Sequence, residues 1–430
     1  SATPRRLAHW AQIVAVAADR QRARLASSAH PRRSEATARS ESGAELLCAE
    51  LATDGLPIDV GCAEEIIASF LGPRPRDERE VVAARQRRDD AVQRLPGVGA
   101  GTDLRNPAHV RAMLGRVGID VPNTRAWRLE PLREAHPVVD ALLTWRKAER
   151  IETTFGYTWL DRHVGADHRL RGGWTASDGA AGRMTAQAGL HNMPADLRDA
   201  VAAEAGHVFV SADLGQIEPR VLAAVSGDAL LAAATADDDM YAPVASRLGV
   251  ERRVAKVAVL AAMYGQTSGA AGQALRGMET SYPDAIKYLR VADESGRNGD
   301  DVFTHGGRRV RMWPVGDHEY EDAAASRAVI AGRGRFARNA VVQGAAAELF
   351  KAWAVTVRAR SAPLGARIVL CLHDELLVHV PVEHAGTVAR LVAESLHEAA
   401  WRWSSAEPLG VDVRFVATAS TIFRWSEAKP

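Results

Sequence analysis

The sequence predicts an α+β fold, with a small antiparallel sheet at the core and large helical insertions around it. Three observations indicate this class. Apolar β-prone runs are few, and long segments with helical periodicity separate them. The chain has 430 residues, which is enough for two or three subdomains with large buried cores. Its 47% hydrophobic and 25% charged residues are typical of globular proteins rather than disordered ones.

Helices are expected throughout the N-terminal part of the chain. A helix over 8–25 precedes a segment rich in Ala, Arg and Ser, 27–40, which we interpret as a linker. The later helices are expected over 42–54, 63–71, 74–94, 106–117 and 137–155. The highly charged helix over 74–94 is either an exposed amphipathic face or a contact for a DNA backbone. The glycine-rich stretch 95–101 lacks the lysine of a phosphate-binding loop, so we interpret it as a turn.

Strands are expected only in the second half of the chain. In order they cover 207–212, 368–372, 376–380 and 411–417. The first strand ends at Asp213, and the second and third form a hairpin around His373, Asp374 and Glu375. Between and after them we expect a mostly helical region over 223–275 and helices over 337–357 and 383–404.

Composition says more about where the protein is located in the cell than about its function. The net charge of +1 gives no global nucleic-acid signature. Only five of the 54 basic residues are Lys, and both phosphate binding by Arg and a compositional bias of the source genome explain this. The three cysteines, Cys48, Cys62 and Cys371, predict neither a disulfide framework nor a zinc site. Without a signal peptide or a membrane-spanning apolar run, we expect a cytoplasmic protein with no membrane partner.

Asp213 and Asp374 each follow an apolar run, where the backbone is held rigidly and the side chain meets solvent. Either aspartate alone is explained equally well as the cap of a strand or turn. Together, with Glu375 beside the second, they could bind two magnesium ions roughly 3.5–4 Å apart. Magnesium suits such a site because it takes few carboxylates and leaves room for substrate phosphates. One ion would lower the pKa of an attacking hydroxyl, and the other would stabilise a leaving pyrophosphate.

A basic helix lies between the two aspartates in the sequence. Arg252, Lys256, Leu260 and Tyr264 are each four residues apart, so they lie along one stripe of a helix. The cations could hold triphosphate oxygens while the other two side chains pack against a sugar and a base. Gly265 would let a templating base approach the backbone closely. A surface helix with a basic edge is the alternative interpretation.

A second polar stripe consists of Arg335, Asn339 and Gln343, again four residues apart. These side chains suit the minor-groove acceptors of a duplex, which look similar for every base pair. A solvated helix face explains them equally well. Arg183 and Asn192 precede the first strand, and we assign them to the same surface.

These segments together resemble the polymerase module of family A, DNA polymerase I-like DNA polymerases. The family pattern D-Y-S-Q-I-E-L-R resembles D-L-G-Q-I-E-P-R over 213–220. R-x-x-x-K with F-x-x-x-Y-G resembles 252–265, H-D-E matches 373–375, and R-x-x-x-N-x-x-x-Q matches 335–343. Weaker similarities cover 182–185 (T-G-R-L-S-S), 191–194 (Q-N-I-P) and 145–155 (the thumb segment). The resemblance extends from about residue 42 to the C-terminus.

The resemblance implies a right-hand polymerase fold with palm, fingers and thumb. Its parts would be 1–41 (N-terminal helix and linker), 42–60 (a helix leading into the palm), 61–155 (thumb), 156–220 and 339–430 (palm) and 221–338 (fingers). The roughly forty residues before the match are too few for an exonuclease module, so either that domain was never present or this chain is a fragment. The implied activity is template-directed addition of dNTPs to a primer 3′-OH in repair or replication. The implied partners are primer-template DNA, a dNTP and two Mg²⁺ ions, with Mn²⁺ as a substitute. We expect a nucleoid-associated monomer.

The resemblance also implies a role for each matching residue. The metal site would comprise Asp213, Leu214 and Asp374, and the catalytic residues would be Asp213, Asp374, Glu375 and Lys256. The nucleotide would meet Arg252, Lys256, Leu260, Tyr264, Gln216, Glu218 and Tyr241. Glu218 would exclude the ribose 2′-OH. The DNA would meet Arg183, Asn192, Arg146, Arg150, Arg335, Asn339, Gln343 and His373.

Several positions depart from the family pattern. Leu214, Gly215 and Pro219 replace Tyr, Ser and Leu, Leu260 replaces an aromatic residue, and Tyr241 replaces a histidine. The stretch between Tyr241 and the basic helix is also several residues short. We therefore expect an altered nucleotide pocket. Two alternatives stay open: a catalytically weakened primer-template binder of the same fold, and a single-subunit RNA polymerase.

Overall fold

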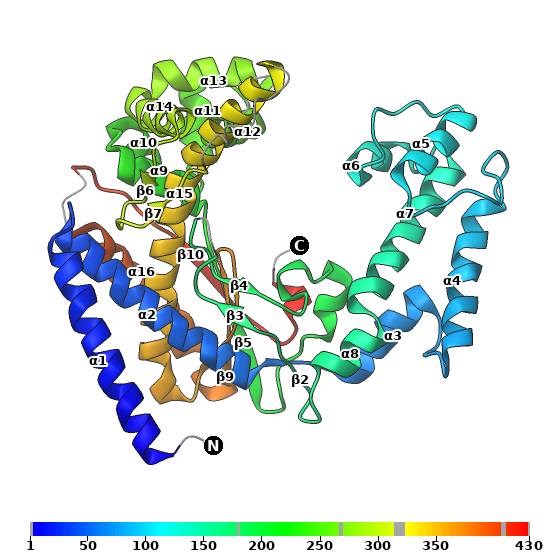
Figure 1. Cartoon of the computed structure of the whole chain (residues 1–430), viewed down its shortest axis with the longest axis horizontal. Coiled ribbons are helices and arrows are strands. Elements are labelled where there is room, and N and C mark those ends of the chain that lie inside the picture. The colour runs from blue at the N-terminus through cyan, green and yellow to red at the C-terminus, as the bar shows by residue number, and fades with distance from the viewer. Residues whose placement is uncertain (1–2, 179–180, 266–269, 314–322, 406–409, 429–430) are drawn as a thin grey trace. The chain divides into compact units, whose positions relative to one another are not determined.

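The computed structural model describes residues 3–178, 181–265, 270–313, 323–405 and 410–428 (Figure 1). The chain divides into two compact units. The first comprises Ser1–Leu56, Gly172–Gln187 and Ala203–Phe423, and the second comprises Pro57–Arg171, Ala188–Ala202 and Arg424–Pro430. Of the helices in these described ranges, none is both long enough and apolar enough to cross a membrane.

A four-stranded antiparallel sheet forms the centre of the first unit. Its strand order is β10-β5-β9-β8, where β5 is His207–Leu214, β8 is Arg367–Leu372, β9 is Glu375–Pro381 and β10 is Ala417–Ile422. Val208, Val210 and Val378 alternate along β5 and β9 and face one large core. The helices that complete this core are α2 (Pro31–Asp54), α9 (Ile217–Ser226), α15 (Ala323–Ser361) and α16 (Ala385–Ser405). The predicted α+β fold with a small antiparallel sheet is confirmed.

A second apolar core in the same unit is almost entirely helical. It lies among α10 (Ala229–Ala234), α11 (Tyr241–Leu248), α12 (Arg252–Tyr264), α13 (Ala270–Ser281), α14 (Pro283–Asn298) and α15. Val244, Val259 and Leu289 are fully buried there. The short strands of this unit are β3 (Trp174–Thr175), β4 (Thr185–Ala186), β6 (Val302–Phe303) and β7 (Arg309–Val310).

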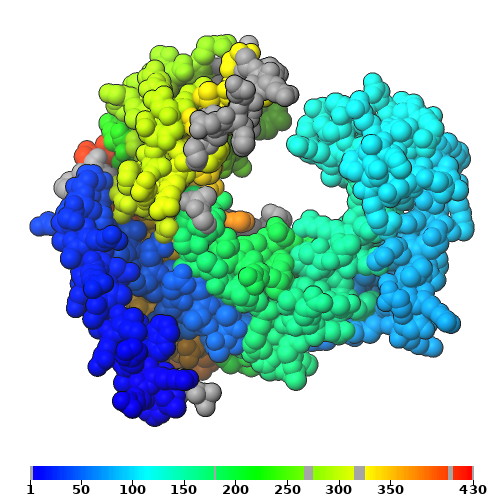
Figure 2. Space-filling view, viewed as in Figure 1, coloured from blue at the N-terminus to red at the C-terminus, as the bar shows by residue number. Residues whose placement is uncertain are grey.

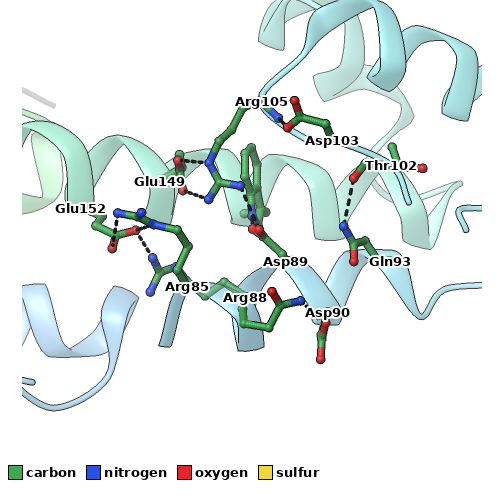
Figure 3. A network of polar contacts seen from close by, with 12 residues as sticks. Arg85, Arg88, Asp89, Asp90, Gln93, Thr102, Asp103, Arg105, Glu149 and Glu152 are labelled. Atoms are coloured by element: carbon green, nitrogen blue, oxygen red, sulfur yellow. Dashed lines mark hydrogen bonds and ion pairs between the residues drawn. The ribbon is translucent and has the colours of Figure 1, made fainter. Parts of the chain in front are cut away.

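The second unit is mainly helical. It contains α3 (Val60–Leu71), α4 (Glu78–Gln93), α5 (Pro107–Arg116), α6 (Ala126–Leu129), α7 (Pro137–Arg150), a π-helical turn Ile151–Phe155, α8 (Tyr157–His163) and the strand β2 (Arg169–Leu170). In Figure 3, Arg105 bridges Asp89 of α4 at 2.8 Å and Glu149 of α7 at 2.7 Å. Glu152 pairs with Arg85 and Arg88 in the same view. Part of the charge of α4 is therefore used to hold α4 against α7.

The segment 27–40 is not the linker that we expected. Helix α2 begins at Pro31 and continues to Asp54, with proline in the first turn, where its missing N–H costs nothing. Glu35 and Arg39 form an ion pair one turn apart at 2.7 Å, which supports the helix. Alanines and serines suggested a linker by composition, but nothing in this segment breaks a helix after Pro31.

The last strand also differs from expectation. Residues 412–416 have no regular structure, and β10 begins at Ala417 instead of ending there. Thr418 and Ser420 of β10 pair with Asp213 and Ser211 of β5. The segment 411–417 looked like a strand because it contains apolar residues such as Phe415, which packs in the core. The observed strand β10 contains mainly alanine, serine and threonine, so it lacks a clear apolar alternation.

Helix α1 (Pro4–Ala26) and helix α2 contribute very differently to the first unit. Figure 2 shows α1, in dark blue, on the surface, and none of its residues is buried. In α2, by contrast, Glu41 reaches the centre of the unit, where it pairs with the fully buried Lys351 of α15 and with Arg308 at 2.8 Å. Lys351 also donates to the carbonyl oxygen of Gly182 at 2.8 Å. Burial lowers the pKa of Lys351, and the Glu41 carboxylate opposes this effect.

Candidate active site

Adjacent strands bring the acidic residues together. Asp213 lies next to the end of β5, opposite Glu375 of β9 in the antiparallel register. The backbone N–H of Leu214 donates to the backbone oxygen of Asp374 at 2.9 Å. His373 has a positive φ of 51°, which closes the turn between β8 and β9. The turn and the end of β5 therefore place Asp213, Asp374 and Glu375 together at one end of the two central strands, β5 and β9. We call this end of the sheet the acidic edge.

Burial and the neighbouring carboxylates at this edge oppose the ionisation of Asp374. The pKa of Asp374 is raised to about 6, first by burial and then by the negative charge of Asp213, with smaller effects from Glu218 and Glu375. A bound divalent cation would reverse this repulsion. The donors present are carboxylate oxygens and the backbone oxygen of Leu214, whose side chain is buried in the core. Such an all-oxygen set fits Mg²⁺ or Mn²⁺.

The raised pKa predicts that Asp374→Asn stabilises the metal-free protein near neutral pH. Because the pKa in the folded state lies above the ordinary value of 3.8, ionisation costs folding free energy, and this cost grows as pH rises from about 3.8 and is complete above about 6. At pH 7.5 the variant should unfold with a free energy higher by up to about 3 kcal/mol, and near pH 4 the difference should vanish. Urea unfolding in EDTA measures this, with Glu383→Gln as an exposed control. Equal stabilities at pH 7.5 would contradict the assignment.

A cavity of about 170 Å³ lies beside the acidic edge. Its lining combines residues predicted for the nucleotide with residues predicted for DNA: Arg183, Gln216, Glu218, Tyr241, Leu260, Gln343, His373 and Asp374. Ala346 and Ala347 of α15 also line it, and sequence reasoning missed them because alanine carries no chemical signal. Their small side chains leave the cavity its space.

Each carboxylate oxygen of Glu218, which lines this cavity, accepts a hydrogen bond. One carboxylate oxygen accepts from the Arg183 guanidinium at 2.5 Å, and the other accepts from the Tyr264 hydroxyl at 3.0 Å. With the side-chain amide of Gln343 oriented so that its oxygen faces Arg183, this oxygen accepts from both terminal guanidinium nitrogens of Arg183, each at 3.0 Å. Burial and the Glu218 charge raise the pKa of Tyr264 to about 12. This chain of contacts links α9, α12 and α15 around the cavity.

The cations of α12 lie outside the cavity lining. Lys256 is exposed, and Arg252 pairs with Asp239 at 2.5 Å, which lowers the pKa of that carboxyl. Tyr241 is buried, with its pKa raised to about 12 mainly by burial, and the Arg252 guanidinium lies 5.7 Å from its ring centre. Exposed ion pairs of this kind contribute little stability, so Arg252 can exchange its partner for a phosphate at small cost.

Arg220, which the sequence analysis did not single out, holds the turn after β5. It is fully buried, and its guanidinium donates to the carbonyl oxygens of Gly215 at 3.0 Å, Thr235 at 2.7 Å and Asp238 at 2.8 Å. Burial lowers its pKa to about 10. Gln216 adopts a positive φ of 49° in this turn, and its side-chain oxygen accepts from Arg220 at 3.3 Å. The signal that could have found Arg220 is a lone arginine within an apolar helix.

The predicted DNA contacts divide between the two units. In the first, Arg335 is exposed and Asn339 is half-buried on α15. Gly265 has a φ of 67°, and an added Cβ would lie 2.9 Å from Arg335 Cγ, so this close approach needs glycine. In the second unit, the predicted residues Arg146, Arg150 and Asn192 lie within α7 and the turn Leu190–Asn192.

Arg146 and Arg150 both donate hydrogen bonds to backbone oxygens within the second unit. Arg150 donates to the Asn192 backbone oxygen at 2.6 Å, and both side chains are exposed. Arg146 donates to the Thr124 backbone oxygen, and burial lowers its pKa.

Residues 114–421 match the model of one protein family, DNA polymerase family A. The chain belongs to DNA polymerase family A. This family A chain is 34% identical over 297 residues to DNA polymerase I of Chloroflexus aurantiacus, covering 62% of this chain and 31% of that protein. It is 32% identical over 319 residues to the thermostable DNA polymerase I of Thermus aquaticus, covering 68% and 37%. The chain thus spans about a third of the length of these relatives.

A solved structure is similar to the family A chain over most of its length. The POL domain of Pol1 from M. smegmatis, in complex with DNA primer-template and dNTP, matches with a TM-score of 0.70 and 25% identity. The match covers 90% of this chain and 70% of that one. The predicted right-hand polymerase fold is therefore confirmed.

Proposed function

We propose that this chain is a template-directed DNA polymerase that transfers a nucleotide from a dNTP to a primer 3′-OH, in DNA replication or repair. The observation that carries the proposal is the placement of the Asp213 and Asp374 carboxylates near each other on adjacent chain segments, beside a cavity that Glu218 lines. Membership of DNA polymerase family A and the likeness to a polymerase solved with DNA primer-template and dNTP support it. We expect the chain to act as a monomer on nucleoid DNA.

Asp213 and Asp374, with the backbone oxygen of Leu214, would hold two Mg²⁺ ions. When bound, these ions would lower the pKa of the primer hydroxyl and offset the charge of the leaving pyrophosphate. Arg252 would leave Asp239 to bind the triphosphate, and Lys256 would donate a proton to pyrophosphate. Glu375 accepts from Ser211 at 3.4 Å, which would keep its carboxylate beside Asp213.

The cavity would receive the sugar and base of the dNTP. Leu260 and Tyr241 would line it, Tyr264 would pack against the base, and Gln216 would fix the turn that presents Glu218. Arg183, Gln343 and His373 would meet the primer-template next to the cavity, together with Asn339 and Arg335 further along α15. We assign Arg146, Arg150 and Asn192 to DNA binding by the second unit. We also propose the thumb, palm and fingers boundaries given above.

Primer extension with each dNTP and each rNTP, in Mg²⁺, tests this function directly. Extension with dNTPs directed by the template is expected. Extension mainly with rNTPs would favour the RNA polymerase alternative. Binding of primer-template without extension would favour the catalytically weakened alternative, which the aliphatic Leu260 in the cavity makes worth testing.

Leu260→Phe should lower the KM for dNTP. Leucine cannot stack on a base, and stacking on an aromatic side chain contributes on the order of 1–3 kcal/mol per base. The expected decrease is about fivefold or more at similar kcat. Single-nucleotide incorporation at varied dNTP concentration measures it, with Val257→Phe, on the exposed side of α12, as the control. A higher KM would mean that the cavity has repacked around leucine.

A further inference from the structure

Three potential metal ligands gather at the end of β5 far from Asp213. Glu204, His207 and His379 each offer one ligand atom, and these atoms lie within 4.8 Å of one another. Glu204 lies in the turn that leads into β5, His207 begins β5, and His379 lies on β9. Because His379 is opposite Phe209 in the register, His207 and His379 project from the same face of the sheet.

The hydrogen bonds of the two imidazoles indicate which ring nitrogen of each could bind a metal ion. His207 Nδ1 lies 3.3 Å from the Ala205 backbone oxygen, which can only accept, so Nδ1 carries the proton and Nε2 the lone pair. His379 Nε2 accepts from the Glu204 backbone N–H at 3.3 Å, so its single lone pair faces the turn, and a metal ion bound there would replace this long hydrogen bond. A ring nitrogen fixed by a backbone carbonyl on its other side is the usual setting of a metal-binding histidine.

The carboxylate of Glu204 completes the set of donors. Its Oε2 atom lies 4.0 Å from His379 Nε2, which is too far for a hydrogen bond. Two metal–ligand bonds of about 2.0–2.1 Å can span that separation after a small adjustment. The side chain of Glu204 is 44% exposed, and His207 is half-exposed, so an ion can enter from solvent although His379 is buried.

The imidazole rings must reorient to share an ion. They are stacked with centroids 4.4 Å apart and an interplanar angle of 9°, and a metal must lie near the plane of each ring that it binds. Both ring planes could meet at one ion only after a large turn of the half-exposed His207 ring about its Cβ–Cγ bond, which would give up its contact with the Ala205 backbone oxygen. His379 would keep its position, because it is buried and its ring packs against that of Phe209, with the ring centroids 5.6 Å apart.

We propose that Glu204, His207 and His379 form a binding site for one Zn²⁺-like transition-metal ion, with water as the fourth ligand. Two imidazoles and one carboxylate are a donor set that Zn²⁺ uses, whereas Mg²⁺ prefers oxygen alone. The site is separate from the proposed catalytic magnesium site, because six residue steps along β5, about 20 Å at 3.3 Å per residue, separate His207 from Asp213. The bound ion would fasten the turn before β5 to β9 and so stabilise the sheet that carries the catalytic carboxylates.

Calorimetric titration of the full chain with Zn²⁺, in excess Mg²⁺, tests the site. We expect one ion bound per chain and a rise in Tm, since an ion that binds only the folded state stabilises it. His207→Gln and Glu204→Gln should each weaken Zn²⁺ binding by about tenfold or more and abolish the rise in Tm. His397→Gln is the matched control, because His397 is exposed on α16, which packs against the opposite face of the sheet.

Two further measurements keep the outcome unambiguous. Asp374→Ala removes a proposed catalytic ligand and should leave the single Zn²⁺ site intact. Co²⁺ in place of Zn²⁺ should give the intense visible absorption of a four-coordinate site, and His207→Gln should remove it. The proposal fails if the native chain binds no Zn²⁺, if His207→Gln and Glu204→Gln both bind as the native chain does, or if Asp374→Ala abolishes binding. His379 is buried, so its substitution could unfold the protein and is not needed.

Discussion

Asp213→Ala and Asp374→Ala should each abolish nucleotide addition while leaving the fold and primer-template binding largely intact. Each aspartate would stabilise charge that develops mainly in the transition state, so its loss lowers the chemical rate more than it weakens binding. We expect a decrease of at least about a thousandfold, which corresponds to roughly 4 kcal/mol of activation free energy. Single-turnover incorporation of one dNTP measures the rate, and fluorescence anisotropy of labelled primer-template measures binding.

The matched control for both variants is Glu383→Ala. Glu383 is an exposed carboxylate just after β9, at the other end of that strand from Glu375, so its removal changes the net charge equally without touching the acidic edge. It should leave the rate unchanged. If either aspartate variant retained even a tenth of the native single-turnover rate, the assignment of two metals to these residues would be wrong.

Glu218→Ala should admit ribonucleotides. A carboxylate beside C2′ of the incoming sugar would clash with a 2′-OH, so discrimination depends on a repulsive contact with the wrong substrate. Arg183 and Tyr264 hold both oxygens of this carboxylate, which keeps it in one position. The ratio of kcat/KM for dCTP over that for CTP should fall by roughly ten- to hundredfold, and dCTP turnover should fall somewhat as well.

Tyr264→Phe separates the carboxylate itself from its positioning. This variant removes the hydrogen bond to Glu218 but keeps the carboxylate and its contact with Arg183, so the ratio should change much less. An unchanged ratio in Glu218→Ala would show that another side chain, or the shape of the cavity around Leu260, excludes the 2′-OH.

The acidic edge of the sheet could be foreseen because its signals are local in the sequence. Strand β5 and the hairpin of β8 and β9 are apolar runs that end at polar residues, and both were predicted within a residue or two. The stripe on α12 follows from helical periodicity alone. Local patterns of this kind depend on a few neighbouring residues, so a single sequence carries them.

The remaining features depend on contacts between distant segments. Arg183 meets Glu218 across 35 residues of sequence, and nothing in either segment encodes the distance between them. The apolar helix around Arg220 suggests that it is buried, but only the folded chain shows that its partners are carbonyl oxygens of the 235–238 loop. Strand β10 is polar on its exposed side, so its pairing with β5 decides its structure rather than its own pattern.

The ion pair between Glu41 and Lys351 limits how far the domain can be truncated from its N-terminal side. The resemblance placed the border of the domain near residue 42, which suggests an expression fragment that starts there. Such a fragment would lose Glu41 and leave the fully buried ammonium of Lys351 with backbone carbonyl oxygens as its remaining partners. Removing one partner of a buried ion pair typically costs about 3–5 kcal/mol, a large share of the stability of most domains. A fragment for expression should therefore begin ahead of Pro31, so that α2 stays whole.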